Sequence, residues 1–370
     1  MSLFDEVDET APARPRMSRR TRIGAISLVV ALVALLAISL LPSSFVIESP
    51  GPVYNTLGTT TDADGDEVPV ISVDGAQTYD TAGQLDLLTV VVTGTPEQPP
   101  SWLEVLAAWF DQTKAVVPME TVYSSDQSSD ERDAETAAEM TDSQTEAEAA
   151  AFSALGYDLD PVVEVYSVLD DGASVGILAA GDEILAVDGT AVSSVDEVRA
   201  AVSAGAGAPV TLLVSRDGTA QELQVTPTAG DDGTWLLGVT TQMSYEMPYD
   251  VTFGLSNVGG PSAGMMFALG IIDQLTPGEL NGGEAVAGTG TISADGTVGA
   301  IGGIRQKMWG ALGAGAEYFL APSSNCDEVV GEVPTGLRVF AVSTLEESLT
   351  VLQTIADGGD LDALATCTAS

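Results

Sequence analysis

Ser262 and Lys307 are the residues of this sequence whose types and setting could form a catalytic pair. Ser262 lies in a Gly-Pro-Ser-Ala-Gly turn, and Lys307 is one of only two lysines in the chain. A serine hydroxyl becomes a nucleophile when a base takes its proton, and the chain has no histidine to do so. Lysine can be that base if burial among apolar side chains lowers its pKa towards neutrality. Ile304, Met308 and Trp309 beside Lys307 indicate such surroundings.

The elements around these residues are predicted to position them. The glycine-rich turn leads into an apolar helix that begins near Ser262, where backbone N–H groups and the helix dipole could face a developing oxyanion. Gly260, Pro261 and Ala263 are therefore candidates for oxyanion stabilisation or substrate positioning. A serine that only caps the helix would give the same local sequence. Lys307 is expected on a helix that follows a glycine-rich corner.

The charge of the chain excludes nucleic acid as a partner. Twelve Lys and Arg residues stand against 54 Asp and Glu residues, for a formal net charge of -42. Phosphate would be repelled by such a surface instead of being neutralised. A solvated acidic surface is a sufficient explanation of this composition.

Residues 23–41 are expected to span a membrane. They form an uncharged, apolar run that is long enough to cross a hydrocarbon core of about 30 Å. Five arginines between residues 14 and 22 precede it, so the positive-inside rule places a basic tail, residues 1–22, in the cytoplasm and residues 42–370 outside. A cleaved signal peptide is the competing interpretation, although its apolar region would be shorter.

Export would make a disulfide between the two cysteines, Cys326 and Cys367, an open alternative to free thiols. With no histidine and two distant cysteines, a zinc site is not expected, and no cofactor is predicted. Residues 359–370 are expected to form a flexible tail.

Residues 42–157 are interpreted as a juxtamembrane region of mixed strands and helices. Short apolar runs at 68–73 and 85–93 predict strands. A helix capped by Ser101 is expected over 101–111, with its aromatic residues in a core or a domain contact, and contact with the membrane is the alternative. The acidic segment 124–156 carries a capping-box pattern and apolar residues at helical spacing, which favours a long amphipathic helix over a disordered linker.

Residues 158–228 resemble a PDZ domain. The resemblance lies in VVEVYSVLDDGASVGILAAGDEILAVDGTAV, followed by a helix at 195–204 and a hairpin around Asp217-Gly218. PDZ domains bind extended peptide ends beside a sheet edge, so the resemblance implies a groove between 162–166 and the helix. The implied groove residues are Val162, Val163, Val165, Val195 and Val198. The loop for a peptide carboxylate is expected near 156–160. A PDZ fold kept only as a spacer is the alternative.

Residues 229–358 are similar to the proteolytic domain of Lon proteases. GGPSAG supplies Ser262 as the family's nucleophile, IGGIRQK supplies Lys307 as its dyad lysine, and GTGTI places Thr289 where a threonine helps to orient the lysine. Two positions differ, because Gly259 and Thr291 stand where the family usually has acidic residues. No GxxxxGK[ST] phosphate loop accompanies the domain.

Taken together, the chain resembles the membrane-anchored, PDZ-containing Lon-like proteases of Gram-positive bacteria, with an α+β fold. The resemblance implies an ATP-independent serine endopeptidase that hydrolyses peptide bonds of exported or membrane-associated proteins, with Ser262 as nucleophile and Lys307 as general base. Its expected partners are protein or peptide substrates and the bilayer, and a ring-shaped homo-oligomer is expected from the resemblance alone. The alternative is an inactive, membrane-tethered PDZ scaffold.

Overall fold

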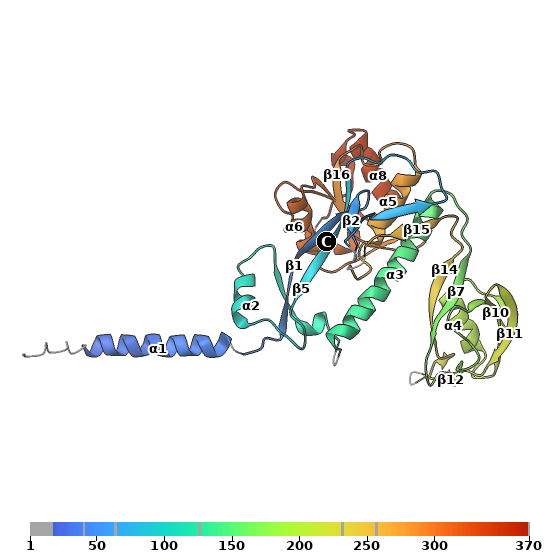
Figure 1. Ribbon diagram of the computed structural model, residues 1–370, viewed down its shortest axis with the longest axis horizontal. Coiled ribbons are helices and arrows are strands. Elements are labelled where there is room, and N and C mark those ends of the chain that lie inside the picture. Colours follow the sequence, from blue (N-terminus) through green and yellow to red (C-terminus); the bar gives the residue numbers. More distant parts are fainter. Residues whose placement is uncertain are drawn as a thin grey trace, which may run out of the picture.

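The computed structural model describes residues 18–39, 41–62, 65–124, 127–230, 233–255 and 258–368 (Figure 1). Most of the predicted cytoplasmic tail, residues 1–17, lies outside this range. The helices are α1 (Arg19–Ser39), α2 (Trp102–Ala108), α3 (Ser129–Ala154), α4 (Val195–Ala204), α5 (Gly264–Leu275), α6 (Ile304–Ala314), α7 (Cys326–Val329) and α8 (Leu345–Ala356). Three short 3₁₀ turns are η1 (Met119–Thr121), η2 (Ser323–Asn325) and η3 (Leu361–Ala363).

The larger domain is built on a six-stranded mixed sheet in the order β20-β19-β16-β5-β1-β6. Its strands are β1 (Phe45–Asn55), β5 (Gln84–Thr93), β6 (Ala115–Pro118), β16 (Ala285–Gly288), β19 (Tyr318–Pro322) and β20 (Arg338–Val342). The strands from β20 to β5 run parallel, whereas β1 is antiparallel to both of its neighbours. Near this sheet lie the short pairs β2 (Thr59–Thr61) with β3 (Glu67–Pro69), β4 (Ile71–Asp74) with β15 (Asp250–Phe253), and β17 (Thr291–Ile292) with β18 (Val298–Gly299).

Helices cover both faces of the six-stranded sheet. On one face α5 packs with α3 and α8, and its Phe267 and Leu269 share a core with Leu85, Leu87 and Phe340 of the strands. On the other face, residues of α6 pack on the alternate positions of the same strands. Ser262, just before α5, and Lys307, in α6, are thus brought together from opposite faces of one sheet.

The sheet corrects the predicted domain boundaries. Residues 42–157 were expected to form a separate juxtamembrane region, but β1, β5 and β6 belong to the same sheet as β16, β19 and β20. Val286 of β16 pairs with Leu85 of β5, so the strands from before and after the second domain share one ladder. The boundary was wrong because a short apolar run predicts a strand but does not predict which strand it pairs with. The second domain is therefore an insertion between α3 and β15.

The inserted domain is an antiparallel sheet in the order β11-β10-β8-β7-β14, covered by α4. Its strands are β7 (Pro161–Val168), β8 (Glu183–Val187), β9 (Thr190–Ala191), β10 (Val210–Arg216), β11 (Thr219–Val225), β12 (Thr228–Ala229), β13 (Trp235–Leu236) and β14 (Val239–Tyr245). The hairpin predicted at Asp217-Gly218 is present, and both residues have the positive φ that a type I′ turn requires. The last strand, β14, lies beyond the boundary predicted at residue 228.

Two helices predicted within residues 42–157 are confirmed. The long helix α3 begins with a capping box in which Ser128 and Glu131 satisfy each other's backbone N–H groups. The shorter helix α2 begins with the same arrangement between Ser101 and Glu104. The expectation for the aromatic residues of α2 was wrong for Trp109 and Phe110, which are exposed at 58% and 84% instead of lying in a core.

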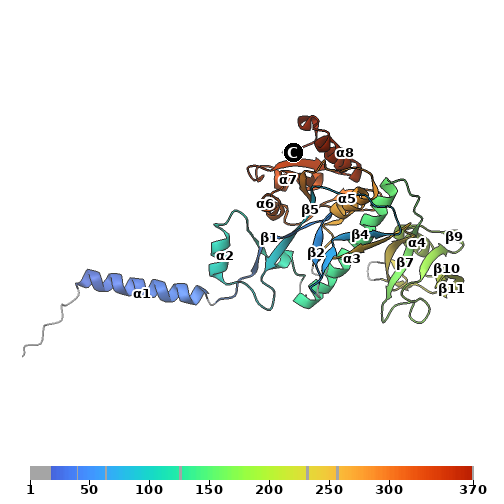
Figure 2. The ribbon, with the colours of Figure 1, turned by 45° about the horizontal axis from the view of Figure 1, so that its top comes forward.

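Helix α1 projects from one side of the molecule, and the inserted domain lies on the opposite side (Figures 1 and 2). The apolar side chains from Ile23 to Val33 are exposed. Among the residues that the structure describes, no helix meets both the length and the apolarity that a membrane crossing needs.

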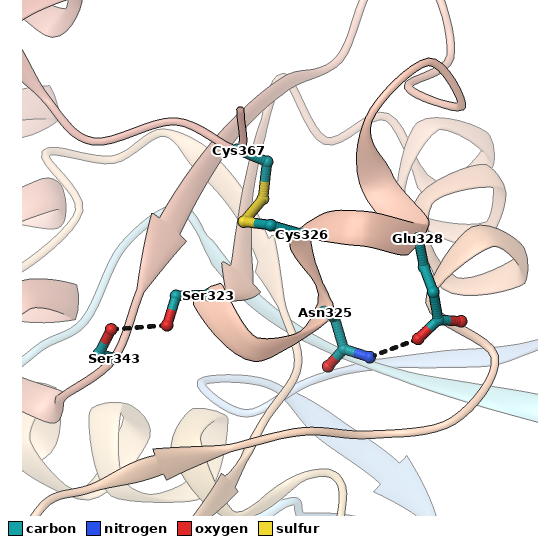
Figure 3. The surroundings of a disulfide bond; sticks show 6 residues. All are labelled: Ser323, Asn325, Cys326, Glu328, Ser343 and Cys367. Atoms are coloured by element: carbon teal, nitrogen blue, oxygen red, sulfur yellow. Dashed lines mark hydrogen bonds between the residues drawn. A yellow bond between two sulfur atoms is a disulfide. The ribbon is translucent and has the colours of Figure 1, made fainter. Parts of the chain in front are cut away.

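A disulfide joins Cys326 at the start of α7 to Cys367 near the end of the chain (Figure 3). Residues 361–368 are therefore held against the larger domain, and Ala341 of β20 donates a backbone hydrogen bond to Ala365. The prediction of a flexible tail over 359–370 is wrong for these residues, because the covalent bond and the η3 turn fix them. Residues 369 and 370 lie outside the described part.

Candidate active site

Ser262 lies in a tight turn between β15 and α5. Gly260 has a φ of +84°, a conformation that favours glycine, and its N–H donates to the carbonyl of Thr136 at 2.8 Å. Ala263 occupies the N-cap position of α5 without any side-chain cap. Ser262 is thus presented at the helix start instead of being used as the cap, which was the alternative structural role for it.

Lys307 reaches the same turn from α6. Its side chain is only 2% exposed, and its Nζ lies 2.6 Å from Oγ of Ser262. The helix begins after Gly303, which has a left-handed conformation. A Cβ atom at residue 303 would approach Val90 of β5 to 2.7 Å, so this corner has no space for a larger residue. The glycine therefore allows α6 to bring its first turn, and with it Lys307, against the sheet.

The glycine-rich corner before α6 is also held by hydrogen bonds from the segment that contains Asn325. The side chain of Asn325, next to the disulfide, accepts a hydrogen bond from the N–H of Ile301 at 3.0 Å and donates to its carbonyl at 2.8 Å. A third hydrogen bond, from Nδ2 of Asn325 to Glu328 of α7, orients that amide (Figure 3). The position of the lysine helix is thus supported by η2 and α7.

Burial lowers the pKa of Lys307 from its ordinary value of 10.5 to about 7. The physical cause is desolvation of the ammonium form in an apolar environment. Although the chain is strongly acidic, no carboxylate contributes to this shift. A substantial fraction of this lysine is therefore neutral near pH 7 and can accept a proton.

Thr289 completes the group and follows directly after β16. It is fully buried, and its Oγ1 lies 2.9 Å from Nζ of Lys307. The same hydroxyl donates to the carbonyl of Ser262 at 3.0 Å. Thr289 thus contacts both the amine of Lys307 and the backbone of Ser262.

The three residues predicted near the oxyanion differ in whether they have a backbone N–H free to donate a hydrogen bond. Pro261 has no N–H, and the N–H of Gly260 is already used by Thr136, so neither can donate to an oxyanion. The expectation for these two residues as donors is therefore wrong, although both line the cleft. Within the described part of the chain, the N–H groups of Ser262 and Ala263 have no hydrogen-bond partner, and both residues face the cleft.

A cleft of about 650 Å³ opens beside Ser262 and Lys307. One wall is the second half of β5, from Leu88 to Val92, and another is the first half of α3, from Ser129 to Met140. The pairing of β16 with β5 ends at Gly288 and Leu87, so β5 continues past its neighbour where it borders the cleft. An extended peptide could lie along this wall with its main chain parallel to the strand.

Helix α3 is a part of the site that sequence reasoning missed. Its Ser143 donates a hydrogen bond to the carbonyl of Pro261 at 2.9 Å, and its Thr136 accepts one from Gly260. The capping box and helical spacing predicted the helix itself, but the acidic composition gave no signal that it would pack on the serine turn.

The packing of α3 explains one of the two departures from the Lon pattern. A Cβ atom at Gly259 would lie 2.8 Å from Oγ1 of Thr136, so an acidic residue has no space there. The other departure, Thr291, pairs with Gly299 in the short β17–β18 ladder. Glycine at 299 leaves room for the hydroxyl of Thr291, because a Cβ atom there would meet it at 2.3 Å.

The predicted peptide groove of the inserted domain is displaced. Strand β7, with Val162, Val163 and Val165, is paired on one side with β8 and on the other with β14, so it has no free edge. A cavity of about 390 Å³ instead lies between α4, with Val195 and Val198, and the segment from Trp235 to Thr241. The strand at the sheet edge is β14, which was predicted to belong to the Lon-type domain, residues 229–358. Residues 156–160, where the carboxylate loop was expected, do not line this cavity.

Comparisons with known proteins agree with the two domain types. Residues 249–355 match the family model of the Lon protease (S16) C-terminal proteolytic domain. The chain contains a Lon-type proteolytic domain. Residues 140–226 match the family model of the PDZ domain, so the inserted domain is PDZ-like. The Lon-type match includes Ser262, Thr289 and Lys307.

The relatives of the Lon-type domain are parts of longer proteins. Lon protease 1 of Sorangium cellulosum is 38% identical over 93 residues, which are 24% of this chain and 11% of that protein. Lon protease of Campylobacter concisus is 28% identical over 144 residues, which are 38% of this chain and 18% of that protein. The chain therefore spans about a tenth to a fifth of the length of these relatives.

Among solved structures, the PDZ-like part is similar to the PDZ domain of the SdrC-like protein from Listeria monocytogenes. The two are 30% identical, and the match covers 21% of this chain and 85% of that one, with a TM-score of 0.21.

Proposed function

We propose that this protein is an ATP-independent, membrane-anchored serine endopeptidase that cleaves exported or membrane-associated proteins with a Ser262–Lys307 dyad. The observation that carries the proposal is the 2.6 Å approach of a buried amine, with a pKa near 7, to the serine hydroxyl. A neutral amine at that distance is placed to take the hydroxyl proton, which is the step that a serine nucleophile requires.

The reaction proceeds in two halves. Lys307 takes the proton of Ser262 as Oγ attacks the carbonyl carbon of the scissile bond, and the resulting oxyanion is stabilised by backbone N–H groups. The lysine then passes its proton to the leaving amine, and the acyl group stays on Oγ. Water, deprotonated by the same amine, hydrolyses the ester and returns Ser262 and Lys307 to their starting states.

The decisive experiment uses the two lysines of the chain as a matched pair. In Lys307→Arg the guanidinium cannot lose a proton near neutral pH, so turnover of an unstructured fluorogenic peptide is expected to fall to background, as in Ser262→Ala. Lys114→Arg is the control, because Lys114 is exposed and forms an ion pair with Asp111. Turnover that persists in Lys307→Arg, or that is lost in Lys114→Arg, would contradict the dyad.

ATP independence is proposed because the sequence has no phosphate-binding loop. Without an unfolding motor, substrates must arrive as extended segments or unstructured chains. Addition of ATP and Mg²⁺ is expected to leave the turnover unchanged, and a several-fold stimulation would refute this part of the proposal.

The membrane anchor is proposed from residues 23–41 and the arginines before them. Supporting this, α2 and the two residues after it expose Leu103, Leu106, Trp109 and Phe110 beside the point where the chain leaves α1. Pro42 bridges to Ser101, and the hydroxyl of Ser43 donates to the carbonyl of Pro100 at 2.7 Å, which ties α2 to this exit. Resistance of the full chain to carbonate extraction, lost on removal of residues 1–41, would support the anchor, and release of the full chain would oppose it.

The alternative is an inactive PDZ scaffold. The cavity between α4 and β14 supports peptide binding in either case. Peptide binding without hydrolysis at any pH would favour the scaffold, and loss of turnover in Ser262→Ala would exclude it.

A further inference from the structure

The peptide unit between Pro261 and Ser262 is held by a side chain from outside the turn. Ser143, which is 5% exposed on α3, donates from Oγ to the carbonyl of Pro261 at 2.9 Å. In a trans peptide the carbonyl and the N–H of one unit point in opposite directions. The hydrogen bond from Ser143 therefore directs the N–H of Ser262 away from α3.

The next peptide unit, between Ser262 and Ala263, is also held by hydrogen bonds to its carbonyl. The carbonyl of Ser262 accepts hydrogen bonds from Oγ1 of Thr289 and from the N–H of Gly290, each at 3.0 Å. The N–H of Ala263 must then point away from these two groups. Two consecutive N–H groups thus have defined directions while neither has a partner within the described residues.

The space for Ser143 depends on Gly264, the first residue of α5. A Cβ atom at Gly264 would lie 2.8 Å from Oγ of Ser143, so α3 and α5 approach as closely as they do because residue 264 has no side chain. Ser143 is buried at this contact between α3 and α5, and its hydroxyl donates there to the carbonyl of Pro261.

We propose that Ser143 is a positioning residue that holds the N–H of Ser262 as an oxyanion donor for the proposed peptidase. This inference rests on the proposed function. Ser143 does not touch the reacting atoms, and it acts through the orientation of the Pro261–Ser262 peptide. Loss of one direct oxyanion donor lowers kcat by about 100- to 1000-fold, and we expect a smaller loss here because the peptide can still sample the correct orientation.

The test measures kcat, KM and the pH profile of the full chain with a fluorogenic peptide, for wild type, Ser143→Ala and Ser143→Thr. Thr141→Ala is the matched control, since Thr141 lies half a turn earlier on α3, is exposed, and its hydroxyl donates to the carbonyl of Ala137 of its own helix. The same proteins are titrated with a peptide boronate, whose tetrahedral adduct on Ser262 places an oxygen where the oxyanion would form.

Ser143→Ala is expected to lower kcat by roughly 10- to 100-fold, with KM changed less than about twofold and boronate affinity reduced in parallel with kcat/KM. The midpoint of the pH profile should stay where it is in wild type, because the Lys307 to Ser262 contact does not involve α3. Ser143→Thr should recover most of the rate, and Thr141→Ala should match wild type.

Three results would overturn the inference. They are an unchanged kcat in Ser143→Ala, a loss confined to KM, and a loss of rate in which boronate affinity is unaffected. If Ser143→Ala does not fold, Ser143→Cys, which keeps a weak donor of similar size, provides the same comparison with a smaller expected loss. Wild-type turnover that survives in Ser262→Ala would instead refute the proposed function, independently of the result at Ser143.

Discussion

The hydroxyl of Thr289 lies 2.9 Å from the amine of Lys307, and it also donates to the backbone of Ser262. One side chain thereby connects the two residues of the proposed dyad. Thr289→Val keeps the shape but removes the hydroxyl, so kcat/KM should fall roughly 10- to 100-fold, as expected for a lost hydrogen bond to a group that becomes charged. Thr289→Ser should stay within a few-fold of wild type. Full activity in Thr289→Val would show that the hydroxyl is not needed.

The pH dependence of turnover should report Lys307. Its pKa is lowered by burial to about 7, and the neutral amine, which is the active form, predominates above that value. We therefore expect kcat/KM to rise as the pH increases through about 7 and to level off above it. Since burial and not a neighbouring charge causes the shift, the midpoint should move little with salt concentration. A rise centred near 10 would mean that the lysine is solvated.

Burial of Lys307 should also lower the free energy of unfolding of the native protein. Between about pH 7 and 10.5 the unfolded chain binds a proton at this position and the native chain does not, so its contribution makes the native state more stable as the pH rises through this window. Below pH 7 the native state must carry a buried ammonium. Lys307→Met should therefore raise the free energy of unfolding at pH 6 by roughly 1–4 kcal/mol. Lys114→Met serves as control, and a destabilised Lys307→Met would contradict the expectation.

The disulfide between Cys326 and Cys367 closes a segment with a sequence separation of 41 residues. Its removal in Cys367→Ser should lower the free energy of unfolding by about 2–4 kcal/mol, because the unfolded chain gains conformational freedom. Denaturant titration with and without reductant measures this effect. The double variant of both cysteines to serine should no longer respond to reductant, and an equal response in wild type and double variant would refute the explanation.

Peptide binding to the inserted domain should depend on the cavity beside β14. Val195 begins α4 and lines this cavity, and an aspartate there is compatible with the helix N-terminus while removing an apolar contact. Val195→Asp should weaken binding of a fluorescein-labelled extended peptide with an apolar carboxyl-terminal residue by about tenfold or more. Val175→Asp, at an exposed site of the same domain outside the cavity, should bind normally. Equal affinities for the two variants would place the groove elsewhere.

Much of the local structure could be predicted from the sequence. Capping residues, helical spacing and turn glycines identified α2, α3, α4 and the hairpin after β10, because each of these signals acts over a few neighbouring residues. Ser262 and Lys307 were found through their turn and corner motifs and Thr289 through the resemblance to Lon proteases, and the structure brings all three within hydrogen-bond distance. Their chemical roles remain proposals.

What the sequence could not supply was pairing over long distances. The register of Leu85 with Val286 crosses the whole inserted domain, and no local pattern encodes it. The predicted groove was misplaced because β14 pairs with β7 and takes its place at the edge of the sheet. The contact of Ser143 with Pro261 joins residues 118 positions apart. The sequence predicted an amphipathic helix around Ser143 but gave no partner for it.

Both chain connections of the inserted domain run directly to the surroundings of Ser262. The incoming connection is α3, whose Thr136 and Ser143 grip the turn, and the outgoing one passes from β14 through β15 towards Val258. The inserted domain is thus joined to the larger domain by two segments that both reach the turn carrying Ser262. A displacement of the inserted domain would therefore act on this turn from both of its chain connections.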